Sequence, residues 1–487
     1  MSIEILSVMV GYIAIVLVIG FYAVRYVKSL RDYLIAGHRL GLIPLTFTYF
    51  ATYFSAVSVF GFTGLVYRSG WSGLWLPIFW ATGSIIGMFI ALRLRRVKLL
   101  SPHEYFKVRF GLPHGFQVFA GLLTVIALMV SLIVQIKSTG IVWSMALGRS
   151  YVEGVLLSMI IILVYVIAGG LYSVAYTDVF QGIMFTVLLI LGGVWALLAT
   201  GGLGGLYAMA SRISTPPTPG ASPTPEGLLT SALGTYTFIP LLFLWLNWAP
   251  GVAAHIRYTQ RMMAARNIDL SLKMYVIAWP ILFVIYLCMA FTALAGRVFI
   301  PTMPEGMSVD YIMPFVFQKY FPPIVAGLFF ACLLAAAMST IDSEVQICNS
   351  IVFTDIQKYL KLSEKGMLTF ARVLAIVVVV ICTLITLYPL PIIIEFSAYC
   401  WGILGVLYFA PMLLGLYWRR VNKWGVVSGI FGGLIVFAIW QMLWGTRIYG
   451  IQPFGVGVLV SILLTFIVSA VTKPPPEECL KMYFSSR

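Results

Sequence analysis

Hydroxyl and carboxyl side chains share one face of an apolar stretch near residue 340, in the sequence Ala-Ala-Ala-Met-Ser-Thr-Ile-Asp-Ser. Ser339, Asp342 and Ser343 are spaced i, i+3 and i+4, which places them on the same face of a helix. The carbonyl of Ala336 lies beside the hydroxyls of Ser339 and Thr340 in that helix. Oxygen atoms grouped in this way suit a hard monovalent cation. The alternative is that the hydroxyls bond back to their own helix.

Two more ionisable residues stand in or beside apolar stretches, where charge is expensive and usually functional. Asp178 either caps the start of a helix or joins Asp342 and Ser343 in a second cation site. Two carboxylates at low dielectric need a counter-ion, so we favour a cation there, sodium or a proton. Lys137 either snorkels to the membrane surface or meets a substrate carboxylate or a buried acid.

Glycine, proline and polar residues interrupt two of the apolar stretches. One contains Ala-Thr-Tyr-Phe-Ser at residues 51–55, with Gly61 and Gly64 beyond it, and the other contains Asn-Trp-Ala-Pro-Gly at residues 247–251. Broken membrane helices line midplane sites in transporters, although glycine and proline are also common in ordinary membrane helices. The candidate solute contacts at this depth are Tyr53, Ser55, Ser58, Gln135, Lys137, Asn247 and Trp248.

The composition requires a lipid environment around these side chains. Of the 487 residues, 61% are hydrophobic and only 10% are charged. Apolar runs long enough to span a bilayer recur from end to end, and backbone groups in lipid must be satisfied within helices. We therefore predict an all-α polytopic membrane protein with about thirteen spans. They lie at 5–27, 44–66, 71–94, 115–145, 152–168, 177–198, 229–253, 274–295, 323–352, 367–387, 396–417, 426–444 and 454–471.

The net charge of +15 sets topology and does not indicate nucleic-acid binding. With the N-terminus outside and the C-terminus in the cytoplasm, most of the 31 basic residues fall in inside loops, as the positive-inside rule requires. We expect a multi-pass protein of the cell membrane. None of the six cysteines falls in an outside loop, so we expect no structural disulfide. No Cys/His spacing indicates a metal site beyond sodium.

The two interrupted spans lie five apart in order, so they enter the membrane from opposite sides. That arrangement is typical of an inverted repeat. The predicted organisation has five parts. They are an extra N-terminal helix and loop (1–43), a first five-helix repeat (44–200), a proline-rich outside loop (201–228), a second five-helix repeat (229–417), and two extra helices with a cytoplasmic tail (418–487).

Four motifs in this order resemble the sodium:solute symporter family, which includes sodium/glucose, sodium/proline and sodium/pantothenate symporters. The matching segments are 32–41, 169–181, 259–266 and 335–343. The resemblance implies a LeuT-type five-plus-five inverted repeat. It also implies a sodium site, made here by the carbonyls of Ala51, Phe54 and Ala336 and the hydroxyls of Ser339 and Thr340. Some members have a further cation site near the signature aspartate, which Asp178 matches.

The segments 295–301 and 322–327 look more like those of pantothenate, proline and monocarboxylate carriers than of sugar carriers. We therefore expect alternating-access symport of a small polar solute with sodium, an organic acid or amino acid being favoured. A proton-coupled carrier or a sugar symporter stays open, and a channel or transport-like sensor is a more distant alternative. We expect sodium, solute and lipid as partners, a monomer as the functional unit, and no enzyme chemistry.

The second cation site makes a prediction. In the wild type, sodium activation of uptake should be cooperative or pH-dependent, because the two carboxylates titrate as a coupled unit. Asp342→Asn should abolish that behaviour, as measured by the sodium Hill coefficient across a pH series. A wild-type coefficient near one with a flat pH profile, unaltered by the substitution, would leave a single-sodium carrier.

Overall fold

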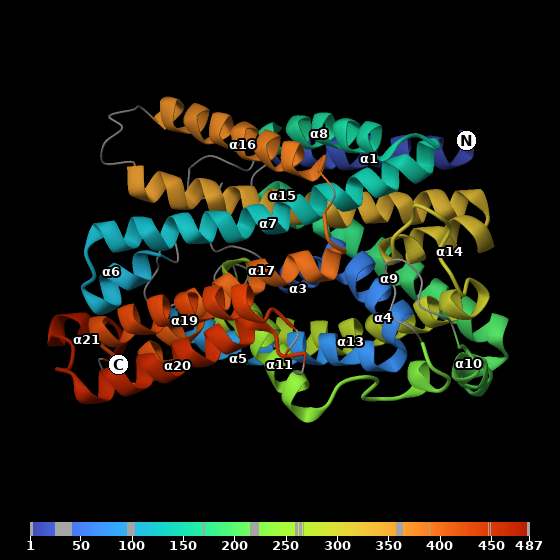
Figure 1. The fold of residues 1–487 in the computed structure, drawn as a ribbon. Helices are drawn as coiled ribbons and strands as arrows, with labels where there is room; N and C mark the ends of the chain where they lie inside the picture. Colours follow the sequence, from blue (N-terminus) through green and yellow to red (C-terminus); the bar gives the residue numbers. More distant parts are fainter. Residues whose placement is uncertain are drawn as a thin grey trace.

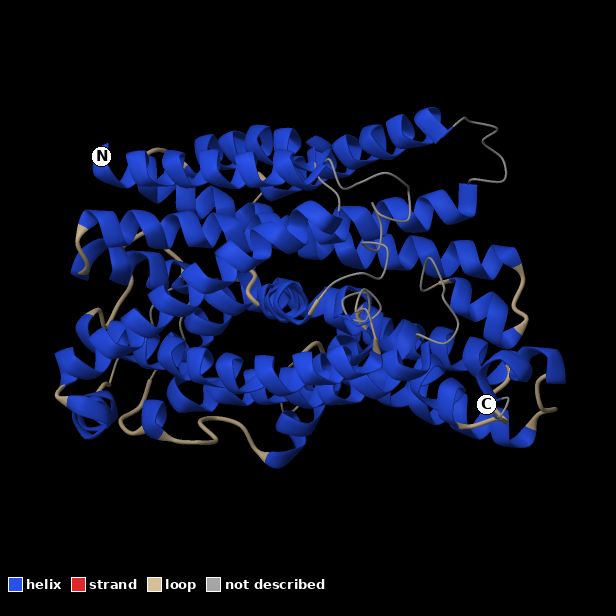
Figure 2. Ribbon diagram, turned by 180° about the vertical axis from the view of Figure 1, so that it is seen from behind, coloured by secondary structure: helices blue, strands red, loops and turns tan. Residues whose placement is uncertain are grey.

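The computed structural model describes residues 3–24, 41–94, 103–168, 171–214, 224–258, 262, 265, 267–356, 364–388, 390–446, 448 and 450–484. All elements of this described part are helices (Figure 2). Several sequence features lie outside it. They are residues 32–40, 169 and 170, most of 259–266, the proline-rich residues 215–223, and the side chains of Asp178 and Asp342.

Each predicted span overlaps a helix or a helix that continues through an irregular turn, although the span predicted at 229–253 begins nine residues before its helix does. Within the described residues, eight helical stretches are long and apolar enough to cross a membrane, and the total of thirteen stays a prediction. The helices are α1 (Ile3–Val24), α3 (Leu42–Tyr53) followed by η2 (Val57–Phe62) and α4 (Thr63–Ser69), α5 (Trp75–Leu94), α7 (His114–Leu147), α8 (Tyr151–Ala168), α9 (Leu171–Thr200), α11 (Phe238–Ala254), α13 (Ile268–Phe299), α15 (Pro323–Ile356), α16 (Glu364–Thr386), α17 (Ile393–Leu404) followed by η6 (Gly405–Phe409) and α18 (Ala410–Tyr417), α19 (Lys423–Leu443) and α20 (Pro453–Val471).

Short helices cover the two ends of the bundle. The end with α6 (Glu104–Phe110) and α21 (Glu477–Phe484) carries Arg93, Arg109, Arg419 and Lys473, and we call it the basic face. The opposite end, the far face, carries α10 (Gly202–Ser211), η5 (Val309–Tyr311) and α14 (Ile312–Tyr320). The described N-terminal end lies at the far face and the C-terminal end at the basic face (Figure 1).

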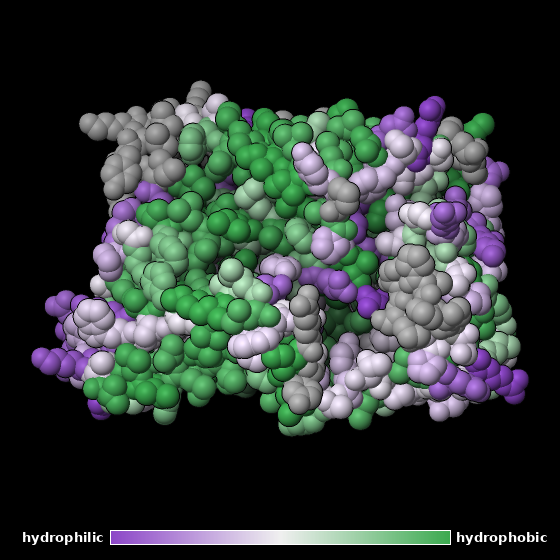
Figure 3. Space-filling model, in the orientation of Figure 1, coloured by the Kyte–Doolittle hydropathy of each residue, from purple (hydrophilic) through white to green (hydrophobic). Residues whose placement is uncertain are grey.

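An apolar band surrounds the middle of the bundle. Figure 3 shows hydrophobic residues across the centre of one face and hydrophilic residues gathered at the two ends. Large apolar side chains point outward on the long helices, among them Leu198, Val276 and Met442, which are 78%, 74% and 85% exposed. Exposure on this scale is unfavourable in water and favourable in lipid. The band therefore marks the surface that faces the bilayer.

The interrupted helix α3 lies inside the bundle, packed against α9, α13 and α15. Helix α17 also lies inside, between α7 and α11, and it contacts η2 (Figure 1). Helices α3 to α9 fall in the predicted first repeat and α11 to α18 in the predicted second repeat, and these bounds stay a prediction. The extra helix α1 packs on α15 and α9, and α19 and α20 pack on each other.

The predicted interruption near residues 51–55 is present. Helix α3 ends at Tyr53, and Phe54 is extended, with φ −90° and ψ 103°. The Ser58 hydroxyl donates to the Tyr53 carbonyl at 2.6 Å and accepts the Ser55 N–H at 2.8 Å. The Ala56 N–H donates to Gln135 Oε1 of α7 at 2.9 Å. These side chains replace the helical hydrogen bonds that the break removes, as burial demands.

The predicted interruption at residues 247–251 was wrong in position. Helix α11 continues through Pro250 and ends at Ala254, and the extended residue is His255, with φ −71° and ψ 122°. Proline removes one backbone donor, and membrane helices tolerate that loss when neighbouring helices support them. Here Gly251 supplies the support, since its Cα packs directly on the carbonyl of Trp401 in α17.

Buried polar contacts join the helices at the basic face. Asp355, near the end of α15, accepts the Gln117 side-chain N–H of α7 at 2.7 Å and lies 3.1 Å from His103 Nε2. Burial raises the pKa of the Asp355 carboxyl, but these bonds outweigh it and hold the pKa below its usual range. The cluster therefore stabilises the fold above the ordinary aspartate pKa, and that contribution is lost as the pH falls through the lowered value.

The close approach of α11 and α17 predicts a strong effect of substitution at Gly251. A Cβ at this position would lie 2.3 Å from the Trp401 carbonyl oxygen, a backbone atom that cannot rotate away. Gly251→Val should destabilise the protein by about 1–3 kcal/mol or more, as overpacking does. Gly11→Val is the matched control, because a Cβ there meets no described atom within 4 Å. Equal thermal stability of the two variants in detergent would contradict the packing argument.

Candidate sodium and solute site

Helix α3, which ends at the break, packs against α15, the helix that carries the polar stretch 335–343. Ala51 and Phe54 stand at the break, and both are buried. Ala336, Ser339 and Thr340 stand on α15 and are at most 4% exposed. The five residues predicted to bind sodium are therefore all buried, and they belong to segments whose helices pack together. That they bind the ion stays a prediction.

The hydroxyls on α15 do not all behave alike. The Ser339 hydroxyl donates to the Ala336 carbonyl at 3.3 Å, and the Ser343 hydroxyl donates to the Ser339 carbonyl at 2.8 Å. Both follow the expected back-bonding to their own helix. The buried Thr340 Oγ1 has no hydrogen-bond partner within the described part of the chain. Because buried polar atoms are nearly always paired, this oxygen is the strongest sign of a ligand here.

The two aspartates of the predicted second cation site belong to helices that pack together, α9 and α15. Asp178 lies about two turns inside α9, which begins at Leu171, so it does not cap that helix. The positions of the two carboxylates lie outside the described residues. The second cation site therefore stays a prediction that rests on helix adjacency.

The candidate solute contacts fall into two groups. Ser55 and Ser58 bond within the break and help to shape it. The second group presents amide or indole N–H donors. Gln135 Nε2, Asn247 Nδ2 and the indole Nε1 of Trp80 are all buried and have no hydrogen-bond partner among the described residues. Three unpaired donors in the core predict a ligand rich in acceptor oxygens. Sequence reasoning missed Trp80, because tryptophan is common throughout this chain.

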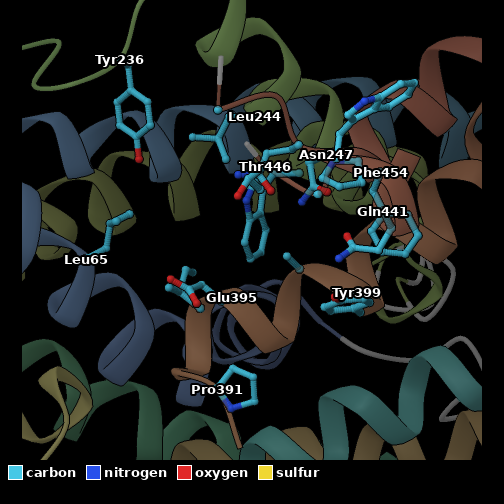
Figure 4. Close-up of a pocket in the computed structure, with 18 of the residues that line it drawn as sticks. Leu65, Tyr236, Leu244, Asn247, Pro391, Glu395, Tyr399, Gln441, Thr446 and Phe454 are labelled. Atoms are coloured by element: carbon cyan, nitrogen blue, oxygen red, sulfur yellow. The ribbon is translucent and has the colours of Figure 1, made fainter. Parts of the chain in front are cut away.

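A cavity of about 940 Å³ has Asn247 and Trp248 in its lining, and Figure 4 shows Asn247 among the residues around it. Its walls come from α4, α11, α17 and the connection between α19 and α20. An ion pair between Arg68 and Glu395, 3.0 Å apart, lies in the wall, and the Glu395 side chain is 59% exposed. The lining of the cavity therefore includes two of the candidate solute contacts, Asn247 and Trp248. Its lining also includes Leu65, Tyr236, Pro391, Tyr399, Gln441, Thr446 and Phe454.

Packed aromatic rings close the other side of the break. The ring of Tyr53 stacks on Tyr258 with centroids 4.4 Å apart, and Tyr258 stacks in turn on Trp401 at 6.1 Å. Tyr49 and Tyr275 pack beside them, with centroids 4.7 Å apart. These side chains are buried, so the core beside the break is filled by packed rings.

Lys137 has a buried acid as its partner, one of the alternatives left open by the sequence. Its Nζ lies 3.1 Å from Asp310 Oδ2 and donates to the Pro391 carbonyl at 2.9 Å. Asp310 is 1% exposed and also accepts the Ile393 N–H at the start of α17. The pair thus joins α7, η5 and α17. Sequence reasoning missed Asp310, since it stands in a loop segment with nothing to connect it to Lys137.

A second buried ion pair, also missed, lies on the opposite side of the break. Arg257 Nη1 is 3.1 Å from Glu344 Oε1, and the side chains are 2% and 0% exposed. The Ser131 hydroxyl of α7 donates to the same carboxylate oxygen at 2.6 Å. Glu344 stands one turn beyond Thr340 in an apolar span. That position alone could have identified it as a candidate.

Comparison with known proteins identifies this arrangement. The model of the sodium:solute symporter family matches residues 33–433. The chain belongs to the sodium:solute symporter family. The osmoregulated proline transporter OpuE of Bacillus subtilis is 26% identical, over 99% of this chain and 98% of its own length. A sodium/proline symporter of Staphylococcus aureus is 26% identical, over 95% of this chain and 92% of its own.

Solved structures agree on the fold. A Na+-coupled sialic acid symporter in a substrate-bound, outward-open state matches with a TM-score of 0.71 at 20% identity, covering 98% of this chain and 99% of the symporter. Mhp1, a nucleobase-cation-symport-1 family transporter, matches with a TM-score of 0.55 at 13% identity, covering 93% and 97%. The all-α inverted-repeat fold is confirmed. This family member is a multi-pass membrane protein that couples transport of a small solute to sodium.

Lys137 could act as a structural partner of Asp310 or as an anchor for the solute, and its substitution has different effects in the two cases. As a structural pair, its loss leaves a buried carboxylate uncompensated, so Lys137→Met should cost roughly 3 kcal/mol of stability. Lys137→Met combined with Asp310→Asn should recover part of that loss. If Lys137 instead anchors the solute, Lys137→Met should keep its thermal stability. Its apparent KM for the solute should rise, and its apparent KM for sodium should not change. Thermal unfolding in detergent and uptake kinetics of the three proteins decide between the two roles.

Proposed function

We propose that this protein is a secondary active transporter that binds sodium at the break of α3 and carries a carboxylate-bearing solute, an amino acid or organic acid. The ligands of the ion are the carbonyls of Ala51, Phe54 and Ala336 and the hydroxyls of Ser339 and Thr340. The observation that carries the proposal is the Thr340 hydroxyl. It is buried on α15, a helix that packs on the interrupted helix α3, and it has no partner in the described part of the molecule.

The chemistry of a carboxylate-bearing solute suits the unpaired donors of Trp80, Gln135 and Asn247. These N–H groups have no hydrogen bonds to give up when a carboxylate binds them. A solute without acceptor oxygens would leave them unsatisfied. The rings of Trp80 and Trp248, with centroids 5.9 Å apart, offer an apolar surface to the rest of the solute. Relatives that transport proline support the same class.

The transport cycle is alternating access. We assign the far face to the outside and the basic face to the cytoplasm, following the distribution of basic residues. Sodium and solute enter through the cavity that reaches Asn247, and they leave when the stacked rings of Tyr53 and Tyr258 separate. Coupling requires that ion and solute each bind the same conformation more tightly than the other. Both sites lie within one chain, so we infer that a monomer is the transport unit.

The sodium site predicts the effect of removing two hydroxyls. Ser339→Ala with Thr340→Ala should abolish sodium-stimulated uptake, because two of about five ligands are lost. The measurement is uptake of radiolabelled proline and of other labelled amino and organic acids into proteoliposomes, with and without a sodium gradient.

Thr383→Ala provides the matched control, because this buried threonine bonds to the carbonyl of Val379 in its own helix. It should retain sodium-stimulated uptake. Normal uptake and sodium affinity in the double variant would show that the ion binds elsewhere. Sodium-independent uptake driven by a proton gradient in the wild type would replace sodium as the coupling ion.

A further inference from the structure

A buried carboxylate lies between the proposed sodium site and the basic face. Glu344 stands on α15 four residues after Thr340, so the two side chains share one face of the helix a single turn apart. Its Oε1 atom accepts the hydroxyl of Ser131 and contacts Arg257. Its Oε2 atom is buried and has no hydrogen-bond partner among the described residues. One of the two carboxylate oxygens of Glu344 is therefore without a hydrogen bond in the described part of the chain.

Two buried oxygens without described partners now stand on one face of α15, Thr340 Oγ1 and Glu344 Oε2. Each is costly to bury unpaired, and the cost is larger for an ionised group. They stand one turn apart along α15, and the Ser131 oxygen lies 2.6 Å from Glu344 Oε1, so hard oxygen atoms follow one another along this helix toward the basic face. Hard oxygens in a row suit a monovalent or divalent cation of the alkali or alkaline-earth type.

Arg257 belongs to the segment that closes this path. It stands in the short turn Ile256–Tyr258, which follows the extended His255 at the end of α11. The neighbouring Tyr258 stacks on Tyr53 just before the break. One turn of chain therefore places a ring beneath the break and a guanidinium on Glu344. Movement of this turn away from the bundle would separate both contacts together.

We propose that Glu344 is a transfer site for sodium on its way to the basic face, and that Arg257 and the ion compete for its carboxylate. The inference rests on the proposed sodium site at Thr340. In the closed conformation, the positive charge of Arg257 repels an ion that leaves Thr340, since like charges at low dielectric repel strongly. When the turn withdraws, the uncompensated carboxylate accepts sodium and draws it out of the first site.

The experiment compares Arg257→Gln with Arg257→Lys in proteoliposomes loaded with radioactive sodium and given no solute. Removing the guanidinium while Glu344 stays should increase sodium efflux by about tenfold, within the range typical of coupling between sites. It should also make thermal unfolding in detergent more dependent on sodium, because an ion then binds the folded state more tightly. Arg257→Lys keeps the charge and should leak much less than Arg257→Gln.

Two further variants make the proposal falsifiable. Arg257→Gln with Glu344→Gln should return sodium efflux to the wild-type level, since the acceptor is gone. A folded Arg257→Gln protein without extra efflux or sodium-dependent stabilisation would overturn the proposal, and so would a double variant that still leaks. A proton leak without a sodium leak would overturn it as well, because the carboxylate would then simply be protonated.

A third variant separates this inference from the proposed sodium site. Ser339→Ala and Thr340→Ala are added to Arg257→Gln, and efflux is measured again. Loss of the leak supports a path that runs through both sites. A persistent leak that still depends on Glu344 would overturn the assignment of the first site at Ser339 and Thr340. The proposed transfer of sodium from Thr340 to Glu344 would then be wrong as well.

Discussion

Every backbone amide and carbonyl at membrane depth needs a hydrogen-bond partner, and the interruption of α3 is possible only because side chains supply those partners. Ser58 binds the groups of Tyr53 and Ser55, and Gln135 reaches across from α7 to the N–H of Ala56. Without them the break would expose several unsatisfied groups. The central feature of the transporter therefore depends on a few short polar contacts inside an apolar bundle.

The same contacts join the break to its surroundings. Gln135 uses its carbonyl oxygen for Ala56, which leaves its amide N–H group pointing into the core without a described partner. One side chain thus supports the backbone and keeps a donor free among the described residues, which suits its proposed contact with the solute. Ser58 and Gln135 hydrogen-bond to the backbone at the break. The affinity of a ligand that binds beside them would therefore depend on the conformation of α3. This is the physical basis on which ion and solute binding can be coupled.

Buried charges obey a similar constraint at the two sides of the break. Lys137 pairs with Asp310 toward the far face, and Arg257 pairs with Glu344 toward the basic face. An unpaired charge in such surroundings is strongly destabilising, so each pair holds a connecting segment against the helices. The first holds η5 at the start of α17, and the second holds the turn after α11. When either face opens, the two residues of the ion pair on that side must move together or separate.

The sequence by itself determined the features that depend on neighbours along the chain. Apolar length located the helices, and i, i+4 spacing placed the Ser339 and Ser343 hydroxyls on one buried face, because both are local properties of a helix. The polar and glycine-rich residues after Ala51 correctly predicted the break in α3. The motifs were enough to predict the family. They did not identify the solute, since solute contacts come from several helices.

Only the tertiary structure decided which distant groups meet. Pro250 looked like a break, yet α11 continues to Ala254 and lies so close to α17 that Gly251 has no room for a Cβ beside the Trp401 carbonyl. Asp310 and Lys137 are far apart in the chain, and so are Glu344 and Arg257, so no spacing rule connects them. The free energy that selects these partners comes from burial, which exists only once the helices have packed.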